Sequence, residues 1–239
     1  MAHRLFLPPS LRAGEARTLS AEHGHYLTRV LRLKPGAEVA CFDGTGREFD
    51  ARLTEASGKT VRLQIEALVR SEPQMPPPLH LALGWLKGQA MDTVTQKATE
   101  LGISDFWPIT ASRSNVKINR QRTAGRVEHW QKIACHAAEQ STRLFVPTVH
   151  EPISLVEYLQ LHTSVPKIML HPGHPPMGTE LPHTPLALLV GPEGGWTASE
   201  VDAARAAGAS VHGLGEWILR AETAPLAALA GIRQLWSWR

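Results

Sequence analysis

Two glycine-rich turns are the parts of this sequence whose residue types best suit the binding of a small ligand. The first, Gly-Pro-Glu-Gly-Gly at 191–195, follows an apolar stretch and precedes a helical pattern that Thr197 or Ser199 can cap. Glycine tolerates positive φ and lets a ligand approach the bare backbone. The spacing fits neither the G-x-G-x-x-G of a dinucleotide fold nor the lysine-bearing loop that cradles phosphates. For this turn alone, a ligand loop and a plain strand-to-helix connection both stay open.

The second turn, at 213–224, carries two charged side chains where the last helical pattern begins. Arg220 stays charged and can donate to carbonyl oxygens, while the carboxylate of Glu222 can accept a proton. An ion pair that only closes the turn is the structural alternative. Thr223 is predicted to cap the terminal helix, with Pro225 in its first turn.

A third group lies near the end of a long helical pattern. His136, Gln140 and Arg143 are spaced i, i+4, i+7, which predicts that they share one helix face. An amide and a guanidinium there could hold a base edge or a phosphate. A surface pair between Glu139 and Arg143 explains the same spacing without a ligand. The remaining histidines show no metal-ligand spacing, so we expect no metal site.

The elements that must position these residues alternate between strand and helix in the C-terminal two thirds of the chain. The predicted strands are 79–86, 106–110, 167–170, 186–190 and 211–214, and the predicted helices are 92–101, 127–141, 155–161, 198–207 and 224–236. This alternation predicts an α/β domain with a mainly parallel sheet. Each glycine turn follows one of the predicted strands.

The first 72 residues have a different pattern. Apolar alternation at 38–43 and 47–53, around Gly-Thr-Gly, predicts a hairpin, with a further strand at 60–66 and a helix near 26–33. On that helix Arg29 and Arg32 could grip an RNA backbone. The alternative is that its leucines and valine face the core and the arginines are merely solvated.

Consecutive prolines at 73–78 cannot continue a sheet interior or a helix, and they favour a stiff connector. We therefore predict a small β-rich domain at 1–72, a linker at 73–78 and an α/β domain at 79–239.

Composition narrows the class of protein. The hydrophobic fraction of 43% with 20% charged residues predicts a folded chain. No apolar run reaches the length of a membrane span, and two distant cysteines suit a reducing compartment, so we expect a cytoplasmic protein. A net charge of +3 does not by itself indicate nucleic acid. A central basic run could track a phosphate backbone or be a solvated surface; its members are Arg113, Lys117, Arg120, Arg122, Arg126 and Lys132.

Five segments, in this order, carry a resemblance to a known family. They are Tyr26-Leu-Thr-Arg-Val-Leu-Arg32, Lys97-Ala-Thr-Glu-Leu-Gly102, Ala137-Ala-Glu-Gln-Ser-Thr-Arg143, Val190-Gly-Pro-Glu-Gly-Gly195 and Leu214-Gly-Glu-Trp-Ile-Leu-Arg-Ala-Glu-Thr-Ala224. Over nearly its whole length the chain resembles the ribosomal RNA small subunit methyltransferase E family. Trp217 and Ala221 stand where the family pattern has arginine and threonine, a departure that bears on RNA contacts more than on the activity.

The resemblance implies a PUA-like β-barrel followed by a SPOUT-type α/β domain whose C-terminal part forms a trefoil knot. It implies S-adenosyl-L-methionine as methyl donor, held by three loops without a metal. The implied donor-binding residues are Leu170, His171, Leu189, Val190, Gly191, Glu193, Gly194, Gly195, Leu214, Gly215, Ile218, Leu219, Thr223 and Ala224.

The resemblance also implies a homodimer that methylates N3 of a uridine in 16S ribosomal RNA, as naked RNA or in the assembled small subunit, with no membrane partner. Arg220 would orient the uracil edge or stabilise charge developing on its carbonyl oxygens. Glu222 would accept the N3 proton or only hold Arg220 in place. The implied RNA-binding residues are Arg29, Arg32, Gln140 and Arg143.

Two other functions fit the same residues. One is a non-catalytic RNA-binding or ribosome-assembly protein, in which the glycine turns are ordinary connections. The other is a knotted-class enzyme that acts on transfer RNA or on a ribose hydroxyl. Binding of the methyl donor separates the first from an enzyme, and the identity of the methylated nucleoside separates the second.

Overall fold

The computed structural model describes residues 3–8, 10–57, 60–72, 77–114 and 120–236, without the side chains of 120–122. It consists of two compact units. The small unit combines Met1–Met75 with Ala138–Val146, and the large unit combines Pro76–Ala137 with Pro147–Arg239. Two predictions lie partly outside the described residues: the proline-rich linker at 73–78, and the basic run, of which Lys117 and the side chains of Arg120 and Arg122 are not described.

The small unit contains a five-stranded sheet. Its strands are β1 (His3–Phe6), β2 (Ala16–Thr18), β3 (Glu38–Phe42), β4 (Arg47–Ser57) and β5 (Thr60–Ser71), in the order β1-β3-β4-β5-β2. The predicted hairpin is confirmed, because β3 and β4 pair antiparallel and are joined through Gly44 and Gly46, both at positive φ. One face of this sheet packs around buried aliphatic side chains such as Leu53, Leu63 and Ile65.

The helix of the small unit differs from the prediction. It begins as α1 (Ala21–His25), where the Ser20 side chain accepts from the His23 N–H, and continues as a π-helix, η1 (Tyr26–Val30). The prediction of 26–33 started it too late, because the N-cap at Ser20 precedes a stretch with little apolar periodicity.

The large unit confirms the predicted α/β architecture with a parallel sheet. Its elements are β6 (Leu79–Gly84), α2 (Ala90–Glu100), β7 (Asp105–Thr110), α3 (Arg120–Gln140), β8 (Thr148–Val149), β9 (Ile153–Ser154), α4 (Leu155–Leu161), β10 (Lys167–Leu170), β11 (Leu186–Val190), α5 (Ala198–Ala206), β12 (Ala209–His212) and α6 (Thr223–Leu235). The strand order is β12-β10-β11-β6-β7-β8, with β9 also on β7, and every pairing is parallel. The last residues of α3 belong to the small unit.

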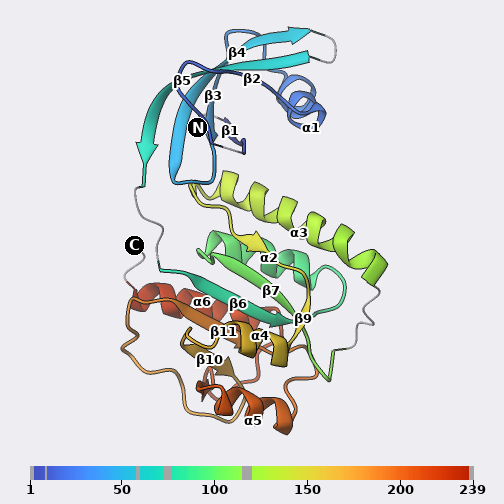
Figure 1. Cartoon of the computed structure of the whole chain (residues 1–239), viewed down its shortest axis with the longest axis vertical. Helices are drawn as coiled ribbons and strands as arrows, with labels where there is room; N and C mark the ends of the chain where they lie inside the picture. Colours follow the sequence, from blue (N-terminus) through green and yellow to red (C-terminus); the bar gives the residue numbers. More distant parts are fainter. Residues whose placement is uncertain (1–2, 9, 58–59, 73–76, 115–119, 237–239) are drawn as a thin grey trace. The chain divides into compact units, whose positions relative to one another are not determined.

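Helices cover both faces of this sheet (Figure 1). On β11, Leu186, Leu188 and Val190 join a core with residues of α2, α3 and α6. The alternate residues Ala187 and Leu189 join a second core with residues of α4 and α5. A strand that is buried on both faces of a sheet has a continuous apolar sequence. The bounds of β10 and β11 could therefore be predicted from the sequence, and the structure confirms them.

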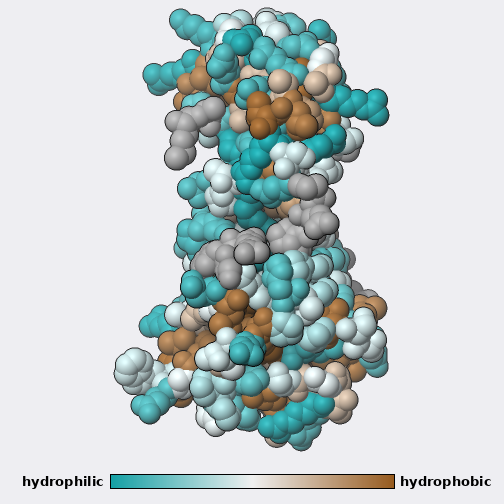
Figure 2. Space-filling model, turned by 90° about the vertical axis from the view of Figure 1, so that its left-hand side faces the viewer, coloured by the Kyte–Doolittle hydropathy of each residue, from teal (hydrophilic) through white to brown (hydrophobic). Residues whose placement is uncertain are grey.

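Hydrophobic residues on the surface form small clusters among hydrophilic ones in the view of Figure 2. Within the described part of the chain, no helix combines the length and the apolar character that crossing a membrane requires.

Candidate functional site

A cavity opens at the carboxyl ends of β10, β11 and β12, the edge of a parallel sheet where ligands commonly bind. It encloses about 720 Å³ of space not filled by atoms, including open solvent at its mouth. The sequence-predicted donor residues that line it are Leu170, His171, Val190, Gly191, Glu193, Gly195, Leu214, Gly215, Ile218, Leu219 and Ala224. The structure thus brings both glycine turns and the end of β10 together around one space.

Three predicted donor residues do not line this cavity. Leu189 points to the opposite face of the sheet, where it is fully buried with α4 and α5. Gly194 faces Arg113, so that an added Cβ would lie 2.8 Å from the Arg113 Cβ. Thr223 is the exposed first residue of α6. For Leu189 the reason is the two-residue period of a strand, which turns it away from Val190.

The first turn is tight and lies against the end of β6. The Gly195 N–H donates to the Pro192 carbonyl at 2.8 Å, with Gly195 at φ +67°. A Cβ on Gly84 would meet the Pro192 nitrogen at 2.3 Å, and one on Gly191 would meet the Gly195 backbone at 3.2 Å. Side chains at Gly84 and Gly191 would therefore displace the turn.

The helix after this turn is anchored by a reciprocal cap. The Thr197 hydroxyl accepts from the Glu200 N–H at 3.3 Å, and the Glu200 carboxylate accepts from Thr197 N–H at 2.7 Å and from Ser112 N–H at 2.8 Å. Burial acts to raise the pKa of Glu200, but these hydrogen bonds outweigh it and hold the pKa below its ordinary value. The predicted cap at Thr197 is confirmed, and it fixes where the turn must end.

The second turn passes close to the segment that follows β10. The Gly213 N–H donates to the Pro175 carbonyl at 2.8 Å, and a Cβ on Gly213 would lie 2.4 Å from the His174 carbonyl oxygen. The His171 N–H donates to the His212 carbonyl at 2.9 Å. Only glycine permits this approach of two backbones.

Arg220 and Glu222 lie beside the cavity rather than among its lining residues. Their charged groups are 3.8 Å apart, and the Arg220 side chain is 86% exposed while that of Glu222 is 33% exposed. The Arg220 carbonyl accepts from the N–H groups of Thr223 and Ala224, both at 2.9 Å, which begins α6. The predicted cap at Thr223 is wrong by one residue: Glu222 occupies the N-cap position without a side-chain cap.

The arginines predicted to bind RNA in the small unit are both exposed. Arg29 lies in η1 and Arg32 follows it at φ +55°. Leu27 is fully buried, as the alternative expected, but Val30 is 58% exposed rather than part of the core. The two arginines that would contact RNA therefore lie at the surface, whereas the buried Leu27 holds the helix in place.

The predicted helix face is wrong for Arg143, because α3 ends at Gln140, while His136 and Gln140 lie within the helix four positions apart, as predicted. Thr142 adopts φ +59°, a left-handed conformation that ends the helical path before Arg143. Glu139, the partner that the alternative reading assigned to Arg143, accepts the Phe6 N–H at 2.8 Å.

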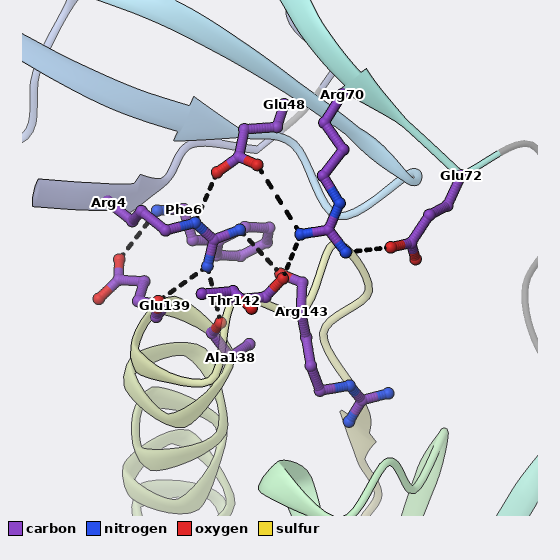
Figure 3. A network of polar contacts seen from close by, with 9 residues as sticks. All are labelled: Arg4, Phe6, Glu48, Arg70, Glu72, Ala138, Glu139, Thr142 and Arg143. Carbon is purple, nitrogen blue, oxygen red and sulfur yellow. Dashed lines mark hydrogen bonds and ion pairs between the residues drawn. The ribbon is translucent and has the colours of Figure 1, made fainter. Parts of the chain in front are cut away.

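This segment is fixed within the small unit by a largely buried arginine side chain, which is 10% exposed (Figure 3). The Arg4 guanidinium pairs with Glu48 at 2.6 Å and donates to the carbonyls of Ala138 (3.0 Å), Glu139 (2.7 Å) and Arg143 (3.1 Å). The Arg143 side chain extends away from this network while its carbonyl is held (Figure 3). The sequence offered no sign of this contact, since it joins residues more than 130 positions apart.

The central basic run is partly engaged within the protein. Arg113 donates to the Gly194 carbonyl at 3.2 Å, Arg126 lies over the Trp85 ring at 5.9 Å, and Lys132 pairs with Glu128 at 3.2 Å. The described part of the chain holds no group of three or more His, Cys, Asp or Glu placed to bind a metal ion.

Comparison with known proteins identifies the class. A family model described as an RNA methyltransferase domain matches residues 73–233, and one described as an RNA methyltransferase PUA domain matches residues 19–66. The parallel sheet with a cavity at its carboxyl edge, preceded by a PUA domain, therefore defines an RNA methyltransferase.

Individual relatives narrow the class further. The chain is 34% identical to ribosomal RNA small subunit methyltransferase E of Synechocystis sp., over 98% of this chain and 78% of that protein. Identity to the Bacillus subtilis protein of the same name is 32%, over 90% and 88%. The Neisseria gonorrhoeae enzyme, solved bound to S-adenosyl methionine, matches with TM-score 0.91 at 33% identity, covering 99% of this chain and 98% of that one. The chain belongs to the ribosomal RNA small subunit methyltransferase E family, which confirms the resemblance read from the motifs.

Several cavity residues were missed from sequence. Trp196 adjoins the predicted Gly195, His212 ends β12, and Pro172, Pro192, Gly213, Trp217 and Ala221 lie within the three loops. These residues could have been predicted from the sequence, because a loop that lines a ligand cavity contributes the neighbours of its glycines as well as the glycines themselves.

Proposed function

We propose that this chain is an S-adenosyl-L-methionine-dependent methyltransferase that methylates N3 of a uridine in the 16S ribosomal RNA of the small subunit. The observation that carries the proposal is the cavity that both glycine turns and the end of β10 line together. Family membership supports the reaction, and the relative from Neisseria gonorrhoeae binds S-adenosyl methionine.

The cavity walls fit such a donor. Most of the cavity walls are apolar, as in Leu170, Leu214 and Leu219, which is typical of small-ligand sites. The described lining residues include no lysine or arginine and one carboxylate, Glu193. A cationic sulfonium needs no lysine or arginine in its site, and a nearby carboxylate suits its charge. When bound, the donor supplies a methyl group already activated by its sulfonium.

The protein's own contribution is mainly to hold the reacting groups in line. Alignment of two reactants can contribute roughly 7–11 kcal/mol to lowering a barrier. Arg220 orients the uracil edge and stabilises negative charge on its carbonyl oxygens, a role that suits an exposed, permanently charged group beside the cavity mouth. Glu222, 3.8 Å from Arg220, accepts the N3 proton. Backbone groups of the turns at 191–195 and 214–219 read the donor's adenine.

Finer features of the fold belong to the same proposal. The domain boundaries are 1–72 and 79–239, the small domain is a PUA-like barrel, and the C-terminal part of the large one forms a SPOUT trefoil knot. Support for the knot is the close passage of Gly213 against His174 and Pro175. Because true knots are rare in proteins, the proposal of a knot needs specific support, and the tight glycine contacts described above are that support.

RNA recognition completes the proposal. Arg29 and Arg32 contact the RNA backbone from the small unit, where both are exposed. Gln140 and Arg143 contact RNA from the segment that Arg4 fixes. The protein acts in the cytoplasm as a homodimer on 16S ribosomal RNA or on the assembled small subunit.

Incubation of the protein with unmethylated small ribosomal subunits and the methyl donor tests the proposal. Digestion of the RNA and mass analysis of the nucleosides is expected to show 3-methyluridine. Calorimetry is expected to show binding of the donor and of its demethylated product. No donor binding would contradict the proposal in favour of a non-catalytic assembly protein, and a 2′-O-methylated nucleoside would contradict the assigned target atom.

A further inference from the structure

One tryptophan differs from the other described tryptophans in its exposure to solvent. Trp217 is 86% exposed, whereas Trp85, Trp130, Trp196 and Trp236 are each 3% exposed or less. Its neighbour Ile218 is 83% exposed. Large apolar side chains exposed together commonly mark a binding surface, because burying them on a partner removes their area from water.

The place of Trp217 in the fold indicates what this partner is. Trp217 lines the same cavity as Gly191 and Leu214, on the loop between β12 and α6. A nucleotide that receives a methyl group from a donor in this cavity must come within bonding distance of the donor. The target base therefore has to enter at the part of the cavity that is open to solvent, where Trp217 is exposed.

Charge at the same loop suits a nucleic acid strand. The Arg220 guanidinium, three residues after Trp217, is 86% exposed. An exposed aromatic ring and an exposed cation on one loop are features that bind unstacked bases, the ring through its face and the cation through the phosphate or a carbonyl oxygen. Uracil is neutral, so the nearby carboxylate of Glu222 does not repel it.

We propose that Trp217 is a substrate-binding residue on which the target pyrimidine, or the base next to it, stacks when the RNA strand enters the cavity. This inference rests on the proposed function and adds to it a specificity residue. Ring stacking holds the base in plane and leaves its N3 edge free for the donor.

Steady-state methylation of unmethylated small ribosomal subunits by Trp217→Ala and Trp217→Phe tests the inference. Loss of a base stack is expected to lower kcat/KM for the particle on the order of tenfold in Trp217→Ala, and Trp217→Phe should recover most of it because its ring still stacks. Calorimetry measures the Kd for the methyl donor in each variant, and a loss of kcat/KM for the particle that disappears at saturating donor would overturn the inference. Leu161→Ala is the matched control, because Leu161 is 65% exposed on α4, away from the cavity lining.

The possible negative results distinguish an error in the inference about Trp217 from an error in the proposed function. If the unaltered protein binds the donor and methylates the particle, but Trp217→Ala matches it in kcat/KM, the inference is overturned while the proposed function stands. If Trp217→Ala instead changes the sedimenting mass from dimer to monomer, Trp217 is covered by a second copy of the chain, and the inference is also overturned. If the unaltered protein itself shows neither donor binding nor methylation, the proposed function is wrong, and the inference that rests on it is wrong as well.

Discussion

At the scale of single residues, the proposed chemistry depends on two charged groups, Arg220 and Glu222, that the fold leaves accessible. The 3.8 Å separation of Arg220 and Glu222 is too long for a strong hydrogen bond, and an arginine so exposed gains little stability from the pair. A purely structural role would call for closer and more buried groups. The pair is therefore better placed to act on a substrate than to close the turn.

Replacement of Glu222 by Gln tests its role as proton acceptor. Gln keeps the size and can still hydrogen-bond to Arg220 but cannot take up the N3 proton. With RNA and donor saturating, kcat is expected to fall at least about a hundredfold, and the loss should shrink as the pH rises and N3 ionises unaided. Unchanged turnover at neutral pH would exclude this role and leave Glu222 as a support for Arg220. Glu216→Gln, an exposed residue of the same loop, is the control.

At the scale of elements, the C-terminal end of α3 is defined by contacts within the small unit. Arg4 satisfies two carbonyls of the last helical turn and one beyond it, a task that a capping glycine performs in many helices. The Arg4 and Glu48 side chains are 10% and 11% exposed. Arg70 adds a hydrogen bond to the Thr142 carbonyl at 2.9 Å and an ion pair with Glu72 (Figure 3). The conformation at 138–143 thus depends on residues at the start of the chain.

Replacement of Arg4 by Met is expected to destabilise the small unit by about 3–5 kcal/mol, because it leaves a buried carboxylate and three carbonyls without their donor. Thermal unfolding measures this loss. Calorimetry should show unchanged donor affinity, since the cavity lies wholly in the large unit, whereas RNA affinity should drop through Gln140 and Arg143.

The matched control is Arg52→Met. Arg52 pairs with Glu38 at 3.0 Å and Glu66 at 2.8 Å, but its side chain is 40% exposed. Exposed pairs of this kind contribute at most about 1 kcal/mol. Equal losses of stability in the two variants would show that the Arg4 network does not hold the segment.

At the scale of the whole molecule, buried ionisable groups make the stability of the fold depend on pH. Asp105 lies 2.7 Å from the His150 ring and 3.6 Å from that of His80. Burial is the main cause that lowers the pKa of His80 and of His162. Burial acts to raise the pKa of Asp105, but the hydrogen bond with His150 and the nearby histidines lower it overall.

These directions predict a loss of stability in acid. Below a pH of about 6.5 the unfolded chain takes up protons on histidine that folded His80 and His162 resist, so the free energy of unfolding falls as the pH falls. Asp105 adds a further loss at lower pH, as the pH falls through its lowered folded pKa. The melting temperature, measured from pH 8 to pH 5, is expected to decline below about pH 7. His80→Gln should flatten part of this decline and the exposed control His25→Gln should not; a melting temperature constant down to pH 5 would contradict the assignment.

The sequence by itself determined the features whose cause is local. An apolar run that is buried on both faces predicted β10 and β11 at their observed bounds. The cap at Thr197 and the turn at 191–195 follow from neighbouring residues, and the motifs identified the family. In each case the residues that decide the structure lie within about ten positions of one another, where periodicity, capping and glycine conformation act.

Only the tertiary structure decided which of these local pieces meet. The short strands β1, β2, β8 and β9 exist through pairing with distant partners, and none shows a pattern of its own. The docking of 138–146 depends on Arg4, and the end of α3 at Gln140 corrected the expected helix face. Likewise, the exposure of Trp217 and the inward turn of Trp196 differ although both follow glycine-rich segments. The strand pairings join segments far apart in the sequence, and the Arg4 contacts join residues up to 139 positions apart. Local sequence patterns carry no information about such contacts, because their free energy arises only when the chain is folded.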